Sequence, residues 1–397
     1  MLDLNTIYHA SYVLKDVLRK TDMISAPIIN PDCGVYLKTE NLQTTGSFKV
    51  RGACYKISQL SDAEKSRGVI ACSAGNHAQG VALAALRHNI KAIICLPDSV
   101  PLSKLDATRS YGAETCLVEG VYDDAYQKAV QLQEDNGYTF IHPFDDEYVI
   151  AGQGTIALEI LDQLPDVEAV IIPVGGGGLI SGVALAIKSL NPKIQVFGVQ
   201  ARGASSMLNS VKEHQIERLD SVSTFADGIA VKEPGKLTFD LCQKYVDDIV
   251  SVSDDEISAA ILMLIERQKM IAEGAGAVAV AAAMFNKVPI QGKKVVSLVS
   301  GGNIDVTILS RVIKRGLLMS GRSGILNIEL IDKPGQLKGV SAIIADHGGN
   351  VIGIHHERAN ENSDVNGCYL RIELETHNFE HIEEIKNALV DAGYLLC

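Results

Sequence analysis

The sequence lacks an excess of basic residues, the usual mark of a chain that binds nucleic acid. It contains 36 Lys and Arg against 48 Asp and Glu, so its formal net charge is −12 at pH 7. An acidic chain has no electrostatic attraction for nucleic acid or for an anionic membrane surface. We therefore expect neither as a partner.

The sequence also lacks a secretory leader and an uninterrupted transmembrane run. Residues 1–16 contain no basic stretch followed by an apolar core, which a signal peptide would require. Residues 169–187 carry no charge, but Pro173 and four consecutive glycines interrupt them. A strand, a loop and a buried helix fit this segment better than a membrane span. We expect a cytoplasmic protein.

Cysteine and histidine patterns typical of metal sites are missing as well. The eight cysteines form no Cys-x-x-Cys pair and no Cys/His cluster with zinc spacing. Several lie inside apolar runs and are expected to be small buried side chains in a reducing compartment. His355 and His356 are adjacent on a predicted strand, so they face opposite sides and make a poor metal-binding pair. These patterns predict no metal site.

What the sequence does contain is a long alternation of apolar strands and helices. With 397 residues, 47% of them hydrophobic, the chain has material for two or three domains. The expected strands are 69–72, 91–96, 114–118, 169–174, 195–199 and 294–299. The expected helices are 3–19, 77–87, 101–111, 122–136, 149–161, 179–190, 254–269, 275–285 and 304–318. Continuous apolar strands separated by helices indicate an α/β fold of parallel βαβ units with both sheet faces covered.

A small, polar linker at residues 319–324 separates this block from a compact tail. The tail has the predicted order strand 325–331, helix 335–347, strand 350–358, loop 360–366, strand 368–375 and helix 379–392. This β-α-β-β-α order, with a short apolar end, fits an α+β ferredoxin-like unit. We predict one domain at 1–320, with a smaller subdomain at about 45–148, and a second domain at 321–397.

One lysine stands out in a turn-forming run at residues 44–53. Lys49 follows Gly46-Ser47-Phe48 and precedes a segment with apolar residues at helical spacing. A lysine at a helix start, beside small residues and one aromatic ring, suits a Schiff base, because a dry site lowers its pKa. A surface lysine in a first helical turn would look the same, so this run alone leaves both interpretations open.

Three further turns each follow a predicted strand and precede a helix. The first is Ser73-Ala74-Gly75-Asn76-His77, which can hold a carboxylate and offer an amide, or can be a capped turn with a solvated histidine. The second is Gly175-Gly176-Gly177-Gly178-Leu179, which fits one phosphate but neither a dinucleotide fingerprint nor a P-loop. The third is Ser300-Gly301-Gly302-Asn303. All three lie at carboxyl ends of strands, where α/β sheets bind ligands, and with the lysine they suggest pyridoxal phosphate.

Together these runs, in this order, resemble the threonine dehydratase (threonine ammonia-lyase) family of fold-type-II pyridoxal-phosphate enzymes. The resemblance extends from near the N-terminus to about residue 318. It implies a tryptophan-synthase-β-like fold with two subdomains of parallel sheet, and pyridoxal 5'-phosphate as the cofactor. It also implies β-elimination of L-threonine to 2-oxobutyrate and ammonia, and of L-serine to pyruvate.

Residue roles carry over from the same resemblance. Lys49 resembles the catalytic Schiff-base lysine, Phe48 the residue packed on the pyridine ring, Asn76 the partner of the ring hydroxyl and Ser300 that of the ring nitrogen. The phosphate loop corresponds to Gly175, Gly176, Gly177, Gly178 and Leu179. The residues expected near the substrate are Ser73, Ala74, Gly75, His77 and Glu273, of which Glu273 could instead cap the next helix. A serine at the ring nitrogen favours elimination over transamination.

The sequence departs from related serine racemases at two places. Residues 200–206 lack the Glu and Asp of their divalent-metal site, so magnesium is in doubt, although a monovalent cation is compatible. Ala74 replaces a serine hydroxyl that could serve as the second acid of racemisation, since a methyl group cannot exchange a proton. We expect a dehydratase with little or no racemase activity.

The tail resembles an ACT domain in the run from Leu330 to Leu337. This implies allosteric control by an amino acid, most plausibly isoleucine or valine, or alternatively a purely structural dimerisation module. The candidate effector-binding residues are Asp332, Gly335, Gln336, Leu337, Asn350 and Ile352. A homo-oligomer, dimer or tetramer, is expected. The alternative functions are a serine-directed dehydratase or racemase and a non-catalytic amino-acid sensor, and the intact Lys49 and tetraglycine favour an enzyme.

Overall fold

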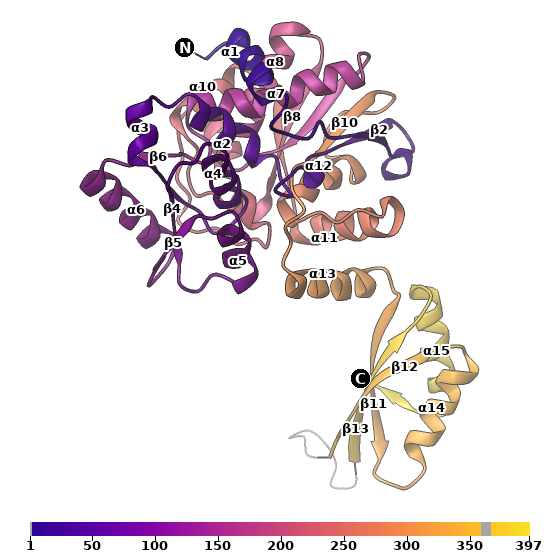
Figure 1. Ribbon diagram of the computed structural model, residues 1–397. Helices are drawn as coiled ribbons and strands as arrows, with labels where there is room; N and C mark the ends of the chain where they lie inside the picture. Colours follow the sequence, from indigo (N-terminus) through magenta and orange to yellow (C-terminus); the bar gives the residue numbers. More distant parts are fainter. Residues whose placement is uncertain (1, 359–366) are drawn as a thin grey trace. The chain divides into compact units, whose positions relative to one another are not determined.

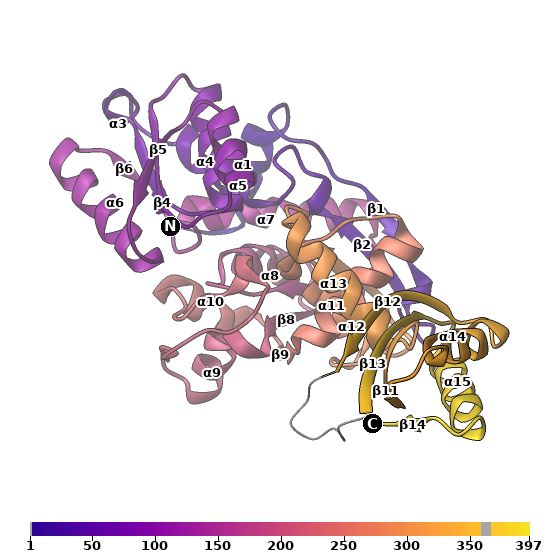
Figure 2. The same ribbon diagram turned by 90° about the horizontal axis from the view of Figure 1, so that it is seen from below.

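The computed structural model describes residues 2–358 and 367–397, and the chain divides into two compact units, Met1–Ile308 and Leu309–Cys397. The predicted boundary at residue 320 stays a prediction. Within the first unit, the larger and the smaller sheet lie in separate regions, each with its own helices (Figures 1 and 2). The predicted loop at 360–366 lies outside the described residues.

The larger sheet of the first unit has six strands in the order β1-β2-β10-β7-β8-β9. The strands are β1 (Met23–Ser25), β2 (Gly34–Thr39), β7 (Ala169–Pro173), β8 (Gln195–Ala201), β9 (Asp248–Val252) and β10 (Lys294–Val299). All neighbours pair in parallel except β1 with β2. The strand pattern of the sequence is confirmed, while β1, β2 and β9 had not been predicted as strands.

Helices cover both faces of this sheet. They are α1 (Leu4–Leu14), α7 (Glu147–Gln163), α8 (Gly178–Leu190), α9 (Ser206–Glu213), α10 (Lys236–Tyr245), α11 (Asp254–Met263) and α12 (Gly274–Met284), with short turns η1 (Pro27–Ile29), η2 (Glu40–Leu42), η3 (Arg202–Ala204), η4 (Asp227–Ile229) and η5 (Leu264–Gln268). Ten residues of α12 are buried, as expected of a helix that is apolar all round. Two predicted ends were wrong: α1 stops at Leu14, and α11 stops at Met263, after which η5 forms a π-helical turn.

The smaller sheet has four parallel strands in the order β5-β4-β3-β6. The strands are β3 (Val69–Cys72), β4 (Ala92–Pro97), β5 (Glu114–Val118) and β6 (Thr139–Phe140), and the helices are α2 (Lys49–Ser58), α3 (Asp62–Arg67), α4 (Asn76–Arg87), α5 (Leu102–Ser110) and α6 (Tyr122–Asn136). Ala125 and Ala129 of α6 pack on one face of the sheet, and α2 and α4 lie on the other. This arrangement confirms the predicted parallel βαβ units.

The second unit is an antiparallel sheet with two helices on one face (Figure 1). Its elements are α13 (Val306–Met319), which begins before the unit boundary, β11 (Ser323–Ile331), α14 (Gln336–Asp346), β12 (Asn350–Glu357), β13 (Gly367–Glu375), α15 (Phe379–Asp391) and β14 (Leu395–Leu396). The strand order β12-β13-β11-β14 is that of a ferredoxin-like unit. The prediction for the tail is confirmed, including the short apolar end.

All eight cysteines are free in the described structure, and six of them are buried. They are the small hydrophobic side chains that the sequence predicts. Among the described residues, no helix has both the length and the apolar character required to cross a bilayer.

Candidate active site

The lysine motif runs along the turn that follows β10. The backbone N–H of Phe48 donates to the carbonyl oxygen of Ser300 (3.1 Å), and that of Gly302 donates to the carbonyl oxygen of Gly46 (2.9 Å). An isolated antiparallel bridge lies between these two bonds. Two stretches that are far apart in the sequence therefore form one wall of a site.

The turn before α4 joins this wall through side-chain amides. The Nδ2 of Asn303 donates to the Oδ1 of Asn76 (2.8 Å) and to the carbonyl oxygen of Thr45 (2.8 Å). The Nδ2 of Asn76 in turn donates to the Oε1 of Glu273 (2.6 Å). The orientation of Asn76 is therefore fixed at both ends of its amide, by partners from two different parts of the chain.

Lys49 and the tetraglycine are connected through the segment that precedes α7. The Nζ of Lys49 donates to the carbonyl oxygen of Pro143 (2.8 Å) and lies 5.3 Å from the ring centroid of Phe48. The next residue, Phe144, packs directly on the glycine loop. A Cβ added at Gly176 would come within 2.4 Å of the Phe144 ring, and one at Gly178 within 2.8 Å of its carbonyl oxygen. Side chains at these positions would displace the segment that holds Lys49.

Gly177 must also be a glycine, but for a different reason from Gly176 and Gly178. Its φ of +96° is in the left-handed region, and an added Cβ would lie 2.6 Å from the Cε of Met207 and 2.8 Å from the Cβ of Thr238. The Oγ1 of Thr238 donates to the carbonyl oxygen of Gly176 (2.6 Å), which fixes the loop from the side of α10.

Two helices begin at this site without a capping side chain. α8 begins at Gly178 and α4 at Asn76, and among the described residues no side chain accepts a hydrogen bond at either start. The first N–H groups of each helix are thus available to an anion, and the positive end of the helix dipole favours one. The site offers two anion-binding positions, one on each subdomain.

Two known protein families match this chain. Residues 14–301 match the model of the family described as pyridoxal-phosphate dependent enzyme. The chain belongs to this family. Residues 324–391 match the model of the ACT domain. The predicted fold, cofactor and ACT domain are confirmed.

Individual relatives of this pyridoxal-phosphate enzyme are similar over most of its length. A protein named L-threonine ammonia-lyase from Thermotoga maritima is 49% identical over 99% of this chain and 98% of its own. The solved structure of processed threonine deaminase isoform 2 from Solanum lycopersicum is 41% identical, with a TM-score of 0.75, over 79% of this chain and 93% of its own. That of maize serine racemase is 35% identical, also with a TM-score of 0.75, over 80% and 98%.

The residues of this enzyme fit its cofactor. Lys49 offers an amine, the glycine loop and the start of α8 offer N–H groups for a phosphate, and the buried Ser300 offers a hydroxyl that now donates to the carbonyl oxygen of Ala275 (3.3 Å). A Cβ added at Gly75 would meet no described atom within 4 Å, so the turn before α4 borders open space.

Burial sets the charges in the site. It lowers the pKa of Lys49 to about 8, with Glu273 acting in the opposite direction. It raises the pKa of Glu273 to about 7, and the neighbouring Asp227 adds to the increase. It lowers the pKa of His77 to about 3, so this imidazole is neutral and its Nε2 donates to the carbonyl oxygen of Ile141 (2.8 Å). Lys49 is thus closer to its neutral, nucleophilic form than a surface lysine.

The structure decides two alternatives that the sequence left open. His77 is only 3% exposed, and Asn76 is the first residue of α4 rather than its cap, so the interpretation as a capped turn with a solvated histidine is wrong. Glu273 does occupy the N-cap position of α12, but its side chain accepts from Asn76 instead of capping the helix. Glu273 therefore belongs to the hydrogen-bond network of the site, and His77 is buried beside it with its Nε2 bonded to Ile141.

The other residues predicted near the site are Ser73, Ala74 and Leu179. Ser73 and Ala74 are partly buried in the turn before α4, where the Oγ of Ser73 accepts from the N–H of Gly75 (3.2 Å). Leu179 is almost fully buried in the hydrophobic core, so it offers the cofactor backbone rather than side chain.

Sequence patterns missed two features of the site. The sequence gives no indication that the carbonyl of Pro143 contacts Lys49 or that the ring of Phe144 packs on the glycine loop, because neither kind of contact requires a recognisable residue pattern. Lys104 of α5 and Asp227 of η4 form an ion pair between the two subdomains. A charge pair this far apart in the sequence can be found only once the fold places both elements at one site.

The predicted effector residues fall into two groups at opposite ends of the sheet of the second unit. The first group consists of Asp332, Gly335, Gln336 and Leu337, around the turn from β11 to α14. The second group begins β12, where the Nδ2 of Asn350 donates to Glu375 (2.8 Å) and Ile352 lies in a bulge. The nine residues of β13 separate the two ends. One copy of the unit does not bring the two groups together.

Proposed function

We propose that this pyridoxal-phosphate enzyme is an L-threonine ammonia-lyase, which converts L-threonine to 2-oxobutyrate and ammonia and L-serine to pyruvate. The observation that carries the proposal is the direct connection of Lys49 to the glycine loop through Pro143 and Phe144. The similarity over nearly the whole length to a protein named L-threonine ammonia-lyase supports the choice of substrate. Steady-state formation of 2-oxobutyrate by the purified holoenzyme, compared with pyruvate formation from L-serine, tests it.

The chain's own residues have defined tasks in this reaction. When bound, pyridoxal phosphate supplies an electron-withdrawing ring that stabilises the negative charge left at the α-carbon. Lys49, with its lowered pKa, is the base that takes the α-proton. The turn before α4 binds the substrate carboxylate with the N–H groups of an uncapped helix start. Glu273 holds Asn76 in position. Ser300 would offer the ring nitrogen a hydroxyl instead of a carboxylate.

A racemase is the second candidate, because maize serine racemase has a similar structure. Racemisation requires a second acid on the face opposite Lys49, and Ala74 offers only a methyl group. We therefore expect the wild-type protein to form little or no D-serine from L-serine. Ala74→Ser should add detectable D-serine formation, measured by a chiral assay. Abundant D-serine from the wild type would contradict this assignment.

We also propose that an amino acid, isoleucine or valine, binds at the turn around Gly335 and changes the activity. The φ of Gly335 is +99°, and an added Cβ would meet no described atom within 4 Å. Among the described residues no side chain caps the start of α14, so its first N–H groups are available to a carboxylate. Couplings of this kind are about 1–3 kcal/mol, or roughly 5–150-fold in affinity.

The expected result is that truncation after Gly321 leaves a working ammonia-lyase that no longer responds to the effector. In the full-length chain, Gln336→Ala should weaken the response, whereas Asn350→Ala, at the other end of the sheet, should weaken it only if a second copy completes the site. Both variants are compared by effector titration of the initial rate. A truncated enzyme with the full response would place the effector site elsewhere.

We further propose a cytoplasmic homo-oligomer, either a dimer or a tetramer. Two isoleucines of β11, Ile325 and Ile331, are exposed on the uncovered face of the sheet in the single chain, which favours a partner surface of the same kind. The alternative of a non-catalytic sensor requires that Lys49 has lost its role, and the Lys49 variant described below tests this.

A further inference from the structure

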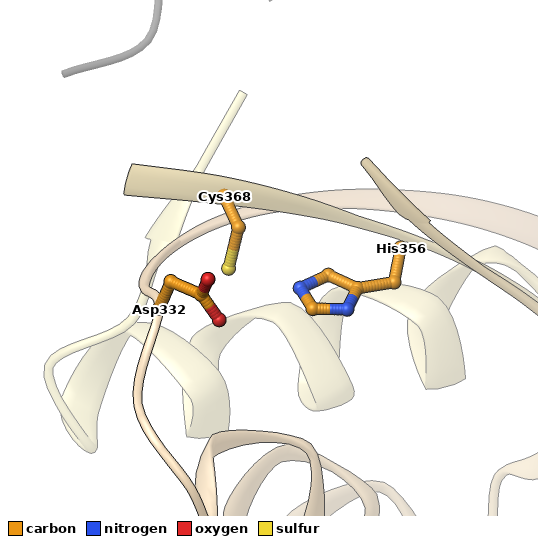
Figure 3. A group of neighbouring side chains, drawn as sticks. All are labelled: Asp332, His356 and Cys368. Carbon is orange, nitrogen blue, oxygen red and sulfur yellow. The ribbon is translucent and has the colours of Figure 1, made fainter. Parts of the chain in front are cut away.

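Three side chains of metal-ligand type meet at one end of the second unit's sheet. Asp332 follows β11, His356 is near the end of β12 and Cys368 is near the start of β13. One ligand atom from each lies within 4.8 Å of the others. Figure 3 shows the carboxylate, the imidazole and the sulfur directed toward one another.

Strand register explains why these three residues meet. Cys368 is opposite Leu330 of β11, and His356 is opposite Leu370 of β13. Opposite residues of an antiparallel pair point to the same face, and both leucines are buried under α14 and α15. Cys368 and His356 therefore point to the helix-covered face, where Asp332 joins them at the end of β11.

His355 points the other way. It is opposite Arg371, which is exposed on the uncovered face. The two adjacent histidines are thus unable to share a metal ion, as their spacing predicts. The partners of His356 come instead from other strands, and no local sequence pattern could indicate them.

The chemistry of the three groups is specific. An imidazole nitrogen, a thiolate sulfur and a carboxylate oxygen are the ligand types of zinc, and three protein ligands leave a fourth position open. Cys368 is 2% exposed, whereas the side chain of Asp332 is 37% exposed, so the group is closed on the core side and open to solvent on the other. We propose that Asp332, His356 and Cys368 bind a divalent cation of the zinc type, with a fourth position open to water or a small ligand.

Binding requires two exchanges. The guanidinium of Arg358 pairs with Asp332 (Nε to Oδ2, 3.1 Å). This ion pair breaks when the cation replaces the guanidinium beside the carboxylate. The thiol of Cys368 gives its proton to solvent as the sulfur–metal bond forms, so one proton is released for each cation bound and no electron is transferred.

Cobalt(II) titration of the full-length holoenzyme, after removal of metals with a chelator, tests the proposal. We expect one cobalt per chain, seen in difference spectra as a thiolate-to-cobalt absorption band with visible bands of tetrahedral type, and displaced by zinc. His356→Gln changes an exposed residue and should weaken binding at least about tenfold. Cys368→Ser should remove the thiolate band.

His355→Gln is the matched control, because it changes the neighbouring histidine on the opposite face. It should bind cobalt as the wild type does. Cobalt binding that is lost in His355→Gln but kept in His356→Gln would overturn the proposal. So would a thiolate band that persists in Cys368→Ser, or the absence of stoichiometric binding by the wild type at micromolar cobalt.

Discussion

Lys49→Ala is expected to abolish the conversion of L-threonine to 2-oxobutyrate while the fold remains intact. The variant loses both the amine that binds the cofactor covalently and the base for the α-proton. The loss of a general base alone costs about 10²–10⁴-fold in rate. Lys49 donates to a backbone carbonyl rather than to a carboxylate, and Glu273 keeps its hydrogen bond from Asn76 when Lys49 is removed.

Lys56→Ala provides the control for this variant. Lys56 is on the same helix, α2, and pairs with Asp146, the N-cap of α7 (2.7 Å). It should retain turnover and the visible absorbance of bound cofactor, both of which Lys49→Ala loses. Circular dichroism and thermal unfolding of the two variants report on the fold. An alanine variant at position 49 with a kcat within tenfold of the wild type would refute the role of Lys49.

The second large effect is expected from Gly177→Ala, which should weaken the binding of pyridoxal phosphate by the apoprotein. A methyl group there would lie 2.6 Å from the Cε of Met207 and would also require a left-handed backbone. The backbone strain alone costs about 1–2 kcal/mol. Relieving the contact moves the loop whose N–H groups hold the phosphate, so we expect at least about a tenfold loss of affinity.

Gly292→Ala is the control, because it introduces backbone strain without a steric contact. Gly292 also has a positive φ, of +73°, but an added Cβ would meet no described atom within 4 Å. This variant should lower the unfolding temperature slightly and leave cofactor affinity unchanged. Cofactor titration of both apoproteins, together with their unfolding temperatures, gives the comparison. Equal cofactor affinities for the two variants would show that the glycine loop is not the phosphate site.

Much of this site was predictable because its residues lie in short runs beside strand ends. Lys49, the tetraglycine, Asn76 and Ser300 could be recognised from their order and local context, and the structure brings them to one place. The parallel sheets followed from apolar strands separated by helices. The motif-bearing elements were therefore the most predictable ones.

The parts that could not be predicted depend on contacts between distant segments. The start of α10 is held by Asp145, which accepts from the N–H groups of Lys236 and Thr238, and no pattern near α10 indicates this. The contact of Lys49 with Pro143 involves a backbone oxygen. Grouping Asn350 with Asp332 failed for a single copy, because strand register places them at opposite ends of the sheet.

Reductive trapping tests the central role of Lys49 most directly. Borohydride reduction of the purified holoenzyme should attach a phosphopyridoxyl group irreversibly to one lysine. Peptide mass spectrometry should then locate it on Lys49, and the Lys49→Ala protein should remain unlabelled. Labelling of a different lysine, or equal labelling of the wild type and Lys49→Ala, would contradict the account.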